Sequence, residues 1–545
     1  MSLETLDRQQ VSSDHPAARL FGWRWLATDN RRMLFTPRPP LVSRFKTHFI
    51  AGLLAALAGL ASSAAAQTPA VTLPPEVDAL LARAKVPRDA LAAIVIDAAP
   101  ALNGKSAPLL SHRAAASMNP ASVMKLVTTY AGLELLGPSF TWNTPVYVDG
   151  TVNDGVLQGN LIIQGKGDPK LVLERLWLLL RRVQALGIKS ISGDILLDRS
   201  AFAGAAQHPA DFDNEPFRPY NVTPDALLIN YKSVVMTFMP NPGSGIANVS
   251  FEPPLANVQM QATVPLSAGQ TAGASLSECG DYRGLLKADF ADAFRIGFNG
   301  SYPAACGEKV WPIAYADPAS YAERTMLGMW QEMGGKLSGR VREGRVPAGL
   351  RPAFEAVSPT LAEVIRDINK FSNNVMAQQL FLTLSLNQGL LSGPRANGAN
   401  GAGAVASKEA SRELVRTWWQ QRFGAQDVPV LDNGSGLSRQ ERLTPQGLAR
   451  LLQTAYVSGA MPELMASLPI TGVDGTLRNS KSRVSQGWAH LKSGTLSDAS
   501  ALAGYVHTPS GRRLVVVAIV NHPNAFAARP ALEAIVDWAV KEGSR

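Results

Sequence analysis

A serine and a lysine three residues apart are the first candidates for chemistry in this chain. Ser122 and Lys125 stand in the run Asn119-Pro-Ala-Ser-Val-Met-Lys, and residues 121–136 have the apolar composition of a buried helix. Side chains three residues apart on a helix lie on the same face. A buried lysine loses its proton more readily than an exposed one, so it can accept the proton of a serine hydroxyl. The pair predicts a serine nucleophile with its own base.

Two further patterns decide whether this pair is more than coincidence, because Ser43 and Lys46 match the same spacing. Ser372 and Asn374 form a Ser-x-Asn pattern within a helical stretch, 360–385; the pattern recurs elsewhere and is weak alone. Lys492-Ser-Gly occurs once, at the start of an apolar strand hairpin. Penicillin-binding proteins and serine β-lactamases carry these three motifs in this order. Order and setting together favour a catalytic site.

Composition bounds the remaining classes of function. A chain of 545 residues predicts more than one domain, and 46% hydrophobic with 17% charged residues indicates a folded protein. The formal net charge of +9 comes without a dense basic run, so we expect no nucleic-acid partner. The seven histidines are scattered, and we expect no metal and no cofactor.

The first 66 residues resemble an upstream extension followed by a secretory signal. Arg44 and Lys46 precede a short apolar core at 49–60, and small residues lead to a cleavage site after Ala66. The core is too short for a membrane span. A start at Val42 would give a signal of ordinary length. The sequence therefore predicts an exported protein.

Two cysteines fall in the expected mature chain. Export and an even count predict a disulfide between Cys279 and Cys306, with two buried free thiols as the alternative.

The remaining pattern predicts a chain interrupted by a long insertion. Apolar alternation between Gly, Asn and Asp turns indicates strands through most of 145–350, with one helix near 171–186, and two nested modules would fit this length. In the flanking parts the pattern predicts helices that begin at 75 and at Thr444-Pro445, and a terminal helix at 529–540. It predicts strands at 91–96, 107–111, 501–507 and 514–521. Residues 393–403 read as a surface link.

Across nearly all of the expected mature chain, the sequence resembles the low-molecular-mass class C penicillin-binding proteins, which are D-alanyl-D-alanine carboxypeptidases and endopeptidases. The resemblance rests on the run from Asn119 to Gly137 and on Gly165-Lys-Gly-Asp-Pro, Gly434-Ser-Gly-Leu-Ser-Arg, Asp474-Gly-Thr-Leu and Lys492-Ser-Gly-Thr-Leu. Ser493 stands where threonine is commoner, and its hydroxyl preserves the chemistry. The upstream extension has no family counterpart.

The resemblance implies an α/β (α+β) fold. A serine β-lactamase/transpeptidase-like domain, with an antiparallel sheet flanked by helices, is expected at 67–144 and 351–545. The strand-rich insertion at 145–350 splits it, and residues 1–66 hold the extension and signal. The implied location is the periplasm.

The resemblance also implies roles for individual residues. Ser122 would attack the peptide carbonyl with Lys125 as base, Ser372 would relay the proton, Asn374 would hold the substrate amide, and Lys492 would face the substrate carboxylate. Substrate contacts are expected from Ser493, Gly494, Thr495, Ser497, Arg439 and Asp198. Two alternatives stay open: Asn374 as a helix cap, and Asp198 as a strand-end turn residue.

The implied substrates are peptidoglycan stem peptides, with β-lactam antibiotics as inhibitors. A homodimer, and loose contacts of the insertion with membrane or cell-wall assembly partners, remain open. A β-lactamase is the nearest rival, but it would not need some 200 inserted residues. A non-catalytic peptidoglycan-binding protein would be expected to have lost a motif residue, and here none is missing.

An intact mass of the exported protein tests both processing expectations. We expect the mass of the chain that begins at Gln67, lowered by two hydrogens because of the Cys279–Cys306 bond. A mass that retains residues 43–66, or one that does not rise by two hydrogens on reduction, would contradict the respective expectation.

Overall fold

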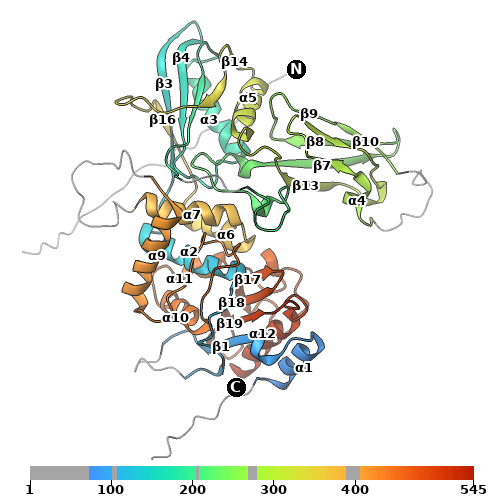
Figure 1. The fold of residues 1–545 in the computed structure, drawn as a ribbon, viewed down its shortest axis with the longest axis vertical. Helices are drawn as coiled ribbons and strands as arrows, with labels where there is room; N and C mark the ends of the chain where they lie inside the picture. The colour runs from blue at the N-terminus through green and yellow to red at the C-terminus, as the bar shows by residue number, and fades with distance from the viewer. Residues whose placement is uncertain (1–72, 101–106, 204–207, 268–278, 388–404, 545) are drawn as a thin grey trace, which may run out of the picture. The chain divides into compact units, whose positions relative to one another are not determined.

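The computed structural model describes residues 73–100, 107–203, 208–267, 279–387 and 405–544 (Figure 1). The extension, the signal with its cleavage site at Ala66, and the link at 393–403 lie outside the described residues. No helix within the described ranges is long and apolar enough to cross a membrane.

A five-stranded antiparallel sheet forms the centre of the part that carries the three motifs. Its strands run in the order β17-β18-β19-β1-β2. Their bounds are β1 Leu91–Asp97, β2 Leu110–His112, β17 Ala489–Leu496, β18 Ala499–His507 and β19 Arg513–Asn521. The first strand therefore pairs with the last, from Leu91 opposite Val520 to Asp97 opposite Leu514. This pairing closes the chain's two distant ends into one sheet.

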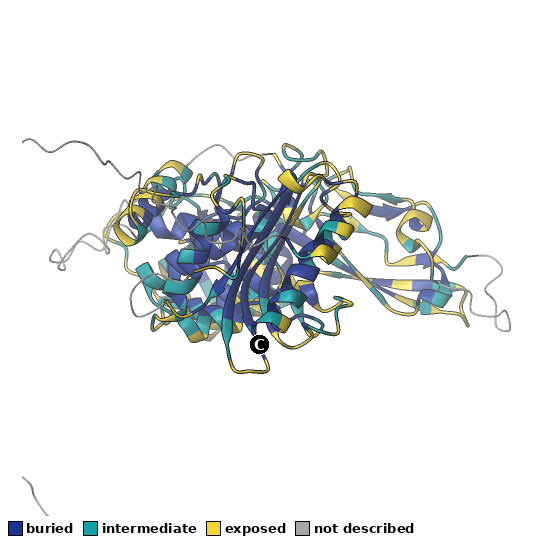
Figure 2. Ribbon diagram, turned by 90° about the horizontal axis from the view of Figure 1, so that it is seen from below, coloured by how far each residue is buried: buried dark blue, intermediate teal, exposed yellow. Residues whose placement is uncertain are grey.

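Helices cover both faces of this sheet, which explains why its strands are apolar on both sides. Alternate residues of β1 and β19 join two different cores: Ile94 and Val517 pack with α2, α6, α7 and α9–α11, while Val95 and Val516 pack with α1 and α12. The helices are α1 Pro75–Arg83, α2 Lys125–Leu136, α6 Leu361–Lys370, α7 Asn374–Leu386, α9 Lys408–Phe423, α10 Pro445–Tyr456, α11 Met461–Ser467 and α12 Arg529–Glu542. Figure 2 shows the buried strands between these helical layers.

Two helices lie at the centre of the larger helical layer and are buried almost all round. Nine of the twelve residues of α2 are buried, and so are the first twelve of α7. The helices meet closely where Gly132 faces Leu380, since a Cβ at Gly132 would lie 3.2 Å from the Leu380 methyl carbons. A surface helix exposes one polar face to solvent, whereas α2 is buried on nearly all sides, so the motif helix is a core element.

Both motif helices depart from the sequence prediction. The stretch 121–136 begins with a 3₁₀ turn, Ala121–Met124, and only then becomes the α-helix α2. The stretch 360–385 is two helices, because α6 ends at Lys370 and α7 begins at Asn374. Ser372 lies in the break with φ of +57°, a left-handed conformation that ends a helix locally. Each break falls at a candidate catalytic serine.

The residues between α2 and α6 form their own sheets and core. A seven-stranded sheet contains β3 Asn143–Asn153, β4 Val156–Gln164, β5 Ser190–Ile191, β6 Ile195–Asp198, β14 Lys336–Leu337, β15 Val341–Glu343 and β16 Phe354–Val357. Helices α3 Leu173–Ala185 and α5 Tyr321–Glu332 contribute to its core. Because β16 pairs with β3, this region takes in residues from 143 to 357, slightly more than the predicted 145–350.

Two smaller sheets belong to the same region. One has the order β10-β8-β7-β13, and the other β11-β12-β9. Their elements are β7 Ser233–Asn241, β8 Ile246–Glu252, β9 Gln259–Met260, β10 Thr263–Pro265, α4 Tyr282–Leu286, β11 Ala288–Asp289, β12 Arg295–Phe298 and β13 Lys309–Ala314. The structure joins Cys279 and Cys306 by a disulfide here, and both residues contact the core of the region.

Candidate active site

The turn that carries Ser122 is held from two sides. The Asn119 side chain accepts a hydrogen bond from the Ala121 backbone N–H (2.9 Å) and donates to the Ser438 carbonyl (3.0 Å). Asn521, at the end of β19, accepts from the Asn119 N–H and donates to its carbonyl. Ala121 takes a left-handed φ of +47°. These contacts fix the backbone on which the Ser122 hydroxyl is presented.

Lys125 begins α2, directly below this turn, and its side chain is fully buried. Its Nζ lies 3.0 Å from Ser122 Oγ and donates to Asn374 Oδ1 (2.6 Å) and to the Ser435 carbonyl. Asn374 Oδ1 and the Ser435 carbonyl oxygen can each accept a hydrogen bond from one N–H of the amine. This leaves the third direction of the nitrogen toward the Ser122 hydroxyl.

Burial also prepares Lys125 for a base's role. It lowers the pKa of this lysine from 10.5 to about 7, and the nearby Glu441 carboxylate opposes part of that shift. A neutral amine is therefore well populated near neutral pH. A base with a pKa close to the working pH combines availability with proton affinity.

Ser372 and Lys492 form the other side of the site. Lys492 Nζ, on β17, donates to Ser372 Oγ (2.9 Å) and to its neighbour's carbonyl at Ser493 (2.7 Å). Ser372 reaches this lysine from the left-handed break between α6 and α7. Asn373 caps α7 by accepting from the Met376 N–H, so Asn374 is the first helical residue and not the cap.

The two lysines of the site influence each other. Lys492 is fully buried, and burial lowers its pKa well below the usual value; the charges of Lys125 and Arg529 lower it further. Two ammonium groups in one buried site repel, so the unliganded site disfavours the doubly protonated state. An anionic group bound at Lys492 would restore its positive charge.

Two glycines let the neighbouring backbones approach Ser122. A Cβ at Gly494 of β17 would lie 2.6 Å from the Pro120 carbonyl oxygen and 3.0 Å from Ser122 N. A Cβ at Gly436 would lie 2.0 Å from the Ala121 carbonyl oxygen. Glycine is required at both places because any side chain would push the serine turn away.

The predicted substrate residues on β17 and its turn surround this centre. Ser493 is buried and its hydroxyl lies 2.7 Å from Thr476 Oγ1, whereas Thr495 and Ser497 are exposed. Arg439 is exposed, lies 3.8 Å from the Asp498 carboxylate beside Ser497, and stacks over the Phe212 ring at 5.1 Å. The structure thus brings Arg439 and Ser497 to the same turn.

Asp198 lies apart from this group, at the end of β6. It is 2% exposed, and its carboxylate accepts from Ser200 N and Oγ, from Val346 N and from Gln164 Nε2. These bonds are those expected of a strand-end turn residue, the alternative left open by the sequence. Asp198 borders a cavity of about 860 Å³, which none of the catalytic candidates lines.

A second buried carboxyl of the insertion has closer links to the site. Asp168, in the Gly165-Lys-Gly turn, is 4% exposed, and burial raises its pKa to about 6. Its Oδ1 accepts from the Lys170 N–H, and the Lys170 side chain pairs with Asp367 of α6, the helix that leads to Ser372. The sequence quoted this motif for resemblance and assigned Asp168 no role.

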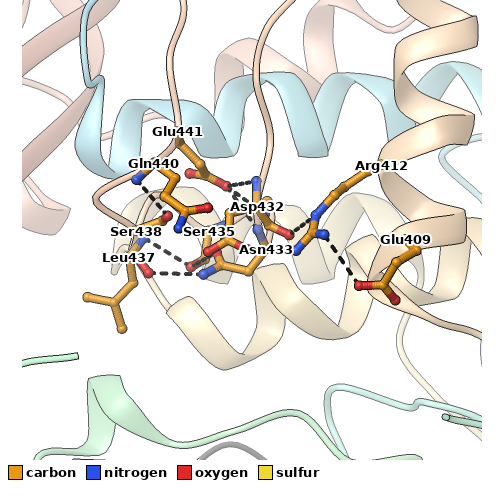
Figure 3. A network of polar contacts seen from close by, with 10 residues as sticks. Glu409, Arg412, Asp432, Asn433, Ser435, Leu437, Ser438, Gln440 and Glu441 are labelled. Carbon is orange, nitrogen blue, oxygen red and sulfur yellow. Dashed lines mark hydrogen bonds and ion pairs between the residues drawn. The ribbon is translucent and has the colours of Figure 1, made fainter. Parts of the chain in front are cut away.

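Glu441 is the other residue near the centre that the sequence did not identify. Its Oε1 accepts three backbone N–H bonds, from Asp432, Asn433 and Gly434, as Figure 3 shows in part. The same loop supplies the Ser435 carbonyl to Lys125. No local pattern signals a carboxylate that binds backbone seven to nine residues earlier.

Comparisons with known proteins agree with this fold and centre. The profile of the D-Ala-D-Ala carboxypeptidase 3 (S13) family matches residues 73–542. The D-alanyl-D-alanine carboxypeptidase of Actinomadura sp. (strain R39) is 28% identical over 500 residues, which cover 88% of this chain and 86% of the relative. The D-alanyl-D-alanine carboxypeptidase DacB of Haemophilus influenzae is 24% identical over 408 residues, 74% of this chain and 80% of that one.

A solved structure has the same fold. The crystal structure of penicillin binding protein 4 (dacB) from Haemophilus influenzae superimposes with a TM-score of 0.63 at 22% identity, covering 84% of this chain and 99% of that one. The same protein complexed with a novel β-lactam gives 0.60. The predicted fold, a transpeptidase-like domain with an insertion, is confirmed.

A sheet covered by helices on both faces, with a serine beside a buried lysine, is the arrangement of the serine enzymes that include penicillin-binding proteins and β-lactamases. Because the family match spans most of its length, this chain belongs to the D-Ala-D-Ala carboxypeptidase 3 (S13) family. The resemblance recognised in the sequence is thereby confirmed, as is the prediction of an enzyme.

Replacing Gly436 with alanine should displace Ser122. Its φ of +81° and the 2.0 Å approach to Ala121 O leave no room for a methyl group. A misplacement of about 1 Å costs roughly 10²-fold in rate. We expect a loss of that order in D-alanine release from a D-Ala-D-Ala peptide. Gly424→Ala is the matched control, because Gly424 has φ of +82° and nothing within 4 Å of its Cβ. Equal effects would contradict this account.

Proposed function

We propose that this enzyme removes the terminal D-alanine of peptidoglycan stem peptides through an acyl-enzyme on Ser122. The observation that carries the proposal is a pair of contact groups, Ser122–Lys125–Asn374 and Ser372–Lys492, whose two lysines repel each other. The first supplies a nucleophile within hydrogen-bond reach of its base, and the second supplies a hydroxyl that can relay a proton, bound to a cation.

The acylation step follows from these contacts. Ser122 Oγ attacks the carbonyl of the penultimate D-alanine, and its proton passes to neutral Lys125 Nζ at 3.0 Å. The backbone N–H groups of Ser122 and Thr495 stabilise the oxyanion, each worth about 3–4 kcal/mol. The peptide C–N bond then breaks, and the leaving amine receives a proton through Ser372. Free D-alanine departs and the acyl group stays on Ser122.

Lys492 and its neighbours recognise the end of the peptide. The substrate's terminal carboxylate offsets the repulsion between the two ammonium groups, so Lys492 stays protonated while Lys125 becomes the neutral member. Ser493 and Thr495 add hydroxyl hydrogen bonds, and Gly494 allows the close approach. Arg439 and Ser497 border the same turn and contact the peptide side chain. Asn374 orients Lys125 and holds the substrate amide.

Deacylation completes the cycle. Water attacks the ester carbonyl, Lys125 takes a proton from it, and Ser122 Oγ leaves with a proton returned by the amine. A β-lactam enters as a mimic of the D-Ala-D-Ala end, acylates Ser122 and leaves slowly. The β-lactam complex of the Haemophilus influenzae protein supports this, since that protein has the same fold.

The division of labour along the chain is part of the proposal. Residues 67–144 and 351–545 carry the catalysis, and the insertion at 145–350 contributes the Tyr220 carbonyl to Asn374 (3.0 Å). Cleavage after Ala66 would place the enzyme in the periplasm, next to its substrate. Cleavage of cross-linked peptides is the second candidate activity, because the same acyl-enzyme forms on either bond.

Ser122→Ala tests the nucleophile. We expect D-alanine release from a D-Ala-D-Ala peptide to fall by at least roughly 10³-fold, because no other group replaces the attacking oxygen. Mass spectrometry after penicillin treatment should show an adduct on the wild-type protein and none on the variant. Ser338→Ala, at an exposed serine of the insertion, should behave as wild type. An adduct on Ser122→Ala would sink the assignment, and penicillin destroyed without an adduct would favour a β-lactamase.

The pH dependence tests the base. Acylation requires neutral Lys125, whose pKa burial lowers to about 7. The rate of penicillin acylation should therefore rise with pH and reach half its plateau near pH 7. Stopped-flow measurements from pH 5 to 9 would reveal this limb. A rate that is flat or falls across this range would rule out Lys125 as the base.

A further inference from the structure

Glu441 is a buried carboxylate that the reaction scheme above does not use. It is fully buried, and it lies in the loop between α9 and α10 that reaches under the catalytic serine. Buried carboxylates are rare unless hydrogen bonds or charges compensate them. Its contacts therefore show what this charge does in the fold.

One oxygen of Glu441 binds three consecutive backbone N–H groups. Oε1 lies 3.1 Å from Asp432 N, 3.1 Å from Asn433 N and 2.9 Å from Gly434 N. Successive N–H groups that converge on one point form an anion-binding concavity. Burial raises the pKa of the Glu441 carboxyl, and these three N–H donors oppose that rise by stabilising the ionised form. Figure 3 shows the carboxylate turned toward this backbone.

Two carbonyls of the same loop accept hydrogen bonds from side chains in the first turn of α2. The Gly434 carbonyl accepts from Thr128 Oγ1 (2.6 Å), and the next carbonyl, that of Ser435, accepts from Lys125 Nζ. Glu441 thus fixes the backbone whose two carbonyl oxygens hold Thr128 and Lys125. Gly434, whose N–H binds Glu441, is followed directly by Ser435, whose carbonyl binds the Lys125 amine.

The charge of Glu441 is only partly balanced by its hydrogen bonds. Its Oε2 is buried and finds no hydrogen-bond partner in the part of the chain that the structure describes. The remaining negative potential favours the protonated form of Lys125, and Glu441 is the group that raises the pKa of that lysine against the effect of burial.

The other charges around the pair have partners of their own. Lys492 faces Lys125 from β17 and is itself repelled by Arg529 of α12. After burial, the neighbouring Asp432 carboxylate is a further cause that raises the pKa of Glu441. Arg412 of α9 binds the Asp432 carboxylate at 2.7 Å and its carbonyl at 2.8 Å, which offsets part of that negative charge. Arg412 also pairs with Glu409 at the surface, where this series of ion pairs ends. Glu441 is the acidic group that acts directly on Lys125.

We propose that Glu441 is a positioning residue of the acylation step: its buried negative charge and three backbone bonds hold the loop 432–441 against Lys125 and favour the protonated lysine. This inference rests on Lys125 acting as the base. Without Glu441, burial alone would lower the pKa of Lys125 further. The amine would then be neutral over a wider pH range, but it would accept the serine proton less readily.

Glu441→Gln separates charge from shape, since the amide oxygen can still accept the three N–H bonds. Removing the negative charge should move the acid limb of penicillin acylation to lower pH by roughly one unit, the lower end of the effect of a close opposite charge. The plateau rate should fall several-fold. Glu409→Gln makes the same change at a 76% exposed carboxylate of the same network and should leave the limb in place.

A second pair of variants keeps the test decisive if the glutamine protein does not fold. Asp and Asn at position 441 share one shape and differ only in charge. We expect the Glu441→Asp protein to retain a higher limb than the Glu441→Asn protein, again by roughly one pH unit. Circular dichroism would establish that each variant is folded.

The outcomes distinguish this inference from the proposed function. A folded Glu441→Gln protein whose limb coincides with that of the wild type would overturn the inference while leaving Lys125 as the base. A uniform loss of rate with an unchanged midpoint would show a purely structural role and would equally overturn it. If the wild type forms no adduct, or shows no limb near pH 7, the proposed function fails first.

Discussion

The burial of one amine controls the rest of the catalytic part. Lys125 has no solvent around it, so every hydrogen-bonding direction of its nitrogen must meet protein. Ser122 comes from the same turn, Asn374 from the start of α7, and the Ser435 carbonyl from the loop between α9 and α10. Three segments far apart in the chain therefore have to converge on one atom. The buried helices α2 and α7 and the doubly covered sheet provide the dry interior in which that convergence is possible.

In this dry interior the two buried lysines of the site, within the part of the chain that the structure describes, lack ion pairs of their own. Two buried lysines face each other across Ser122 and Ser372, and neither has a direct ion pair at its nitrogen among the described residues. The nearby carboxylates of the described ranges do not contact these lysines directly. Glu441 binds the backbone of the loop that holds Lys125. Asp474 pairs with Lys370, and the segment after Asp474 brings Thr476 to Ser493. Glu441 raises the pKa of Lys125 without forming an ion pair with it. A salt bridge directly on Lys125 would have fixed its proton and ended its use as a base.

The sequence predicted those features that short stretches of chain encode. Ser122 and Lys125 follow from helical spacing, and the strands β18 and β19 from apolar runs with a turn between them. The features it missed depend on distant contacts. Residues 360–385 have helical composition throughout, so nothing local announces the break at Ser372, which the bond to Lys492 on β17 accompanies. Glu441 binds backbone seven to nine residues earlier, a partner that spacing does not reveal. For Asp198 the sequence left open the turn role that its bonds to Ser200 fit, but spacing does not reveal the bond from Val346 N.

The pairing of β1 with β19 has a consequence for how the protein must be made. Residues 91–97 form the fourth strand of a five-stranded sheet whose other long strands lie beyond residue 488, so this strand has no long neighbour until almost the whole polypeptide exists. Sheets built from such distant segments form slowly, because the entropy of closing a very long loop opposes the first contact. The intervening strands and their separate core can assemble beforehand and shorten that loop. Active enzyme is then the last product of folding, and the nucleophile is not assembled on an incomplete chain.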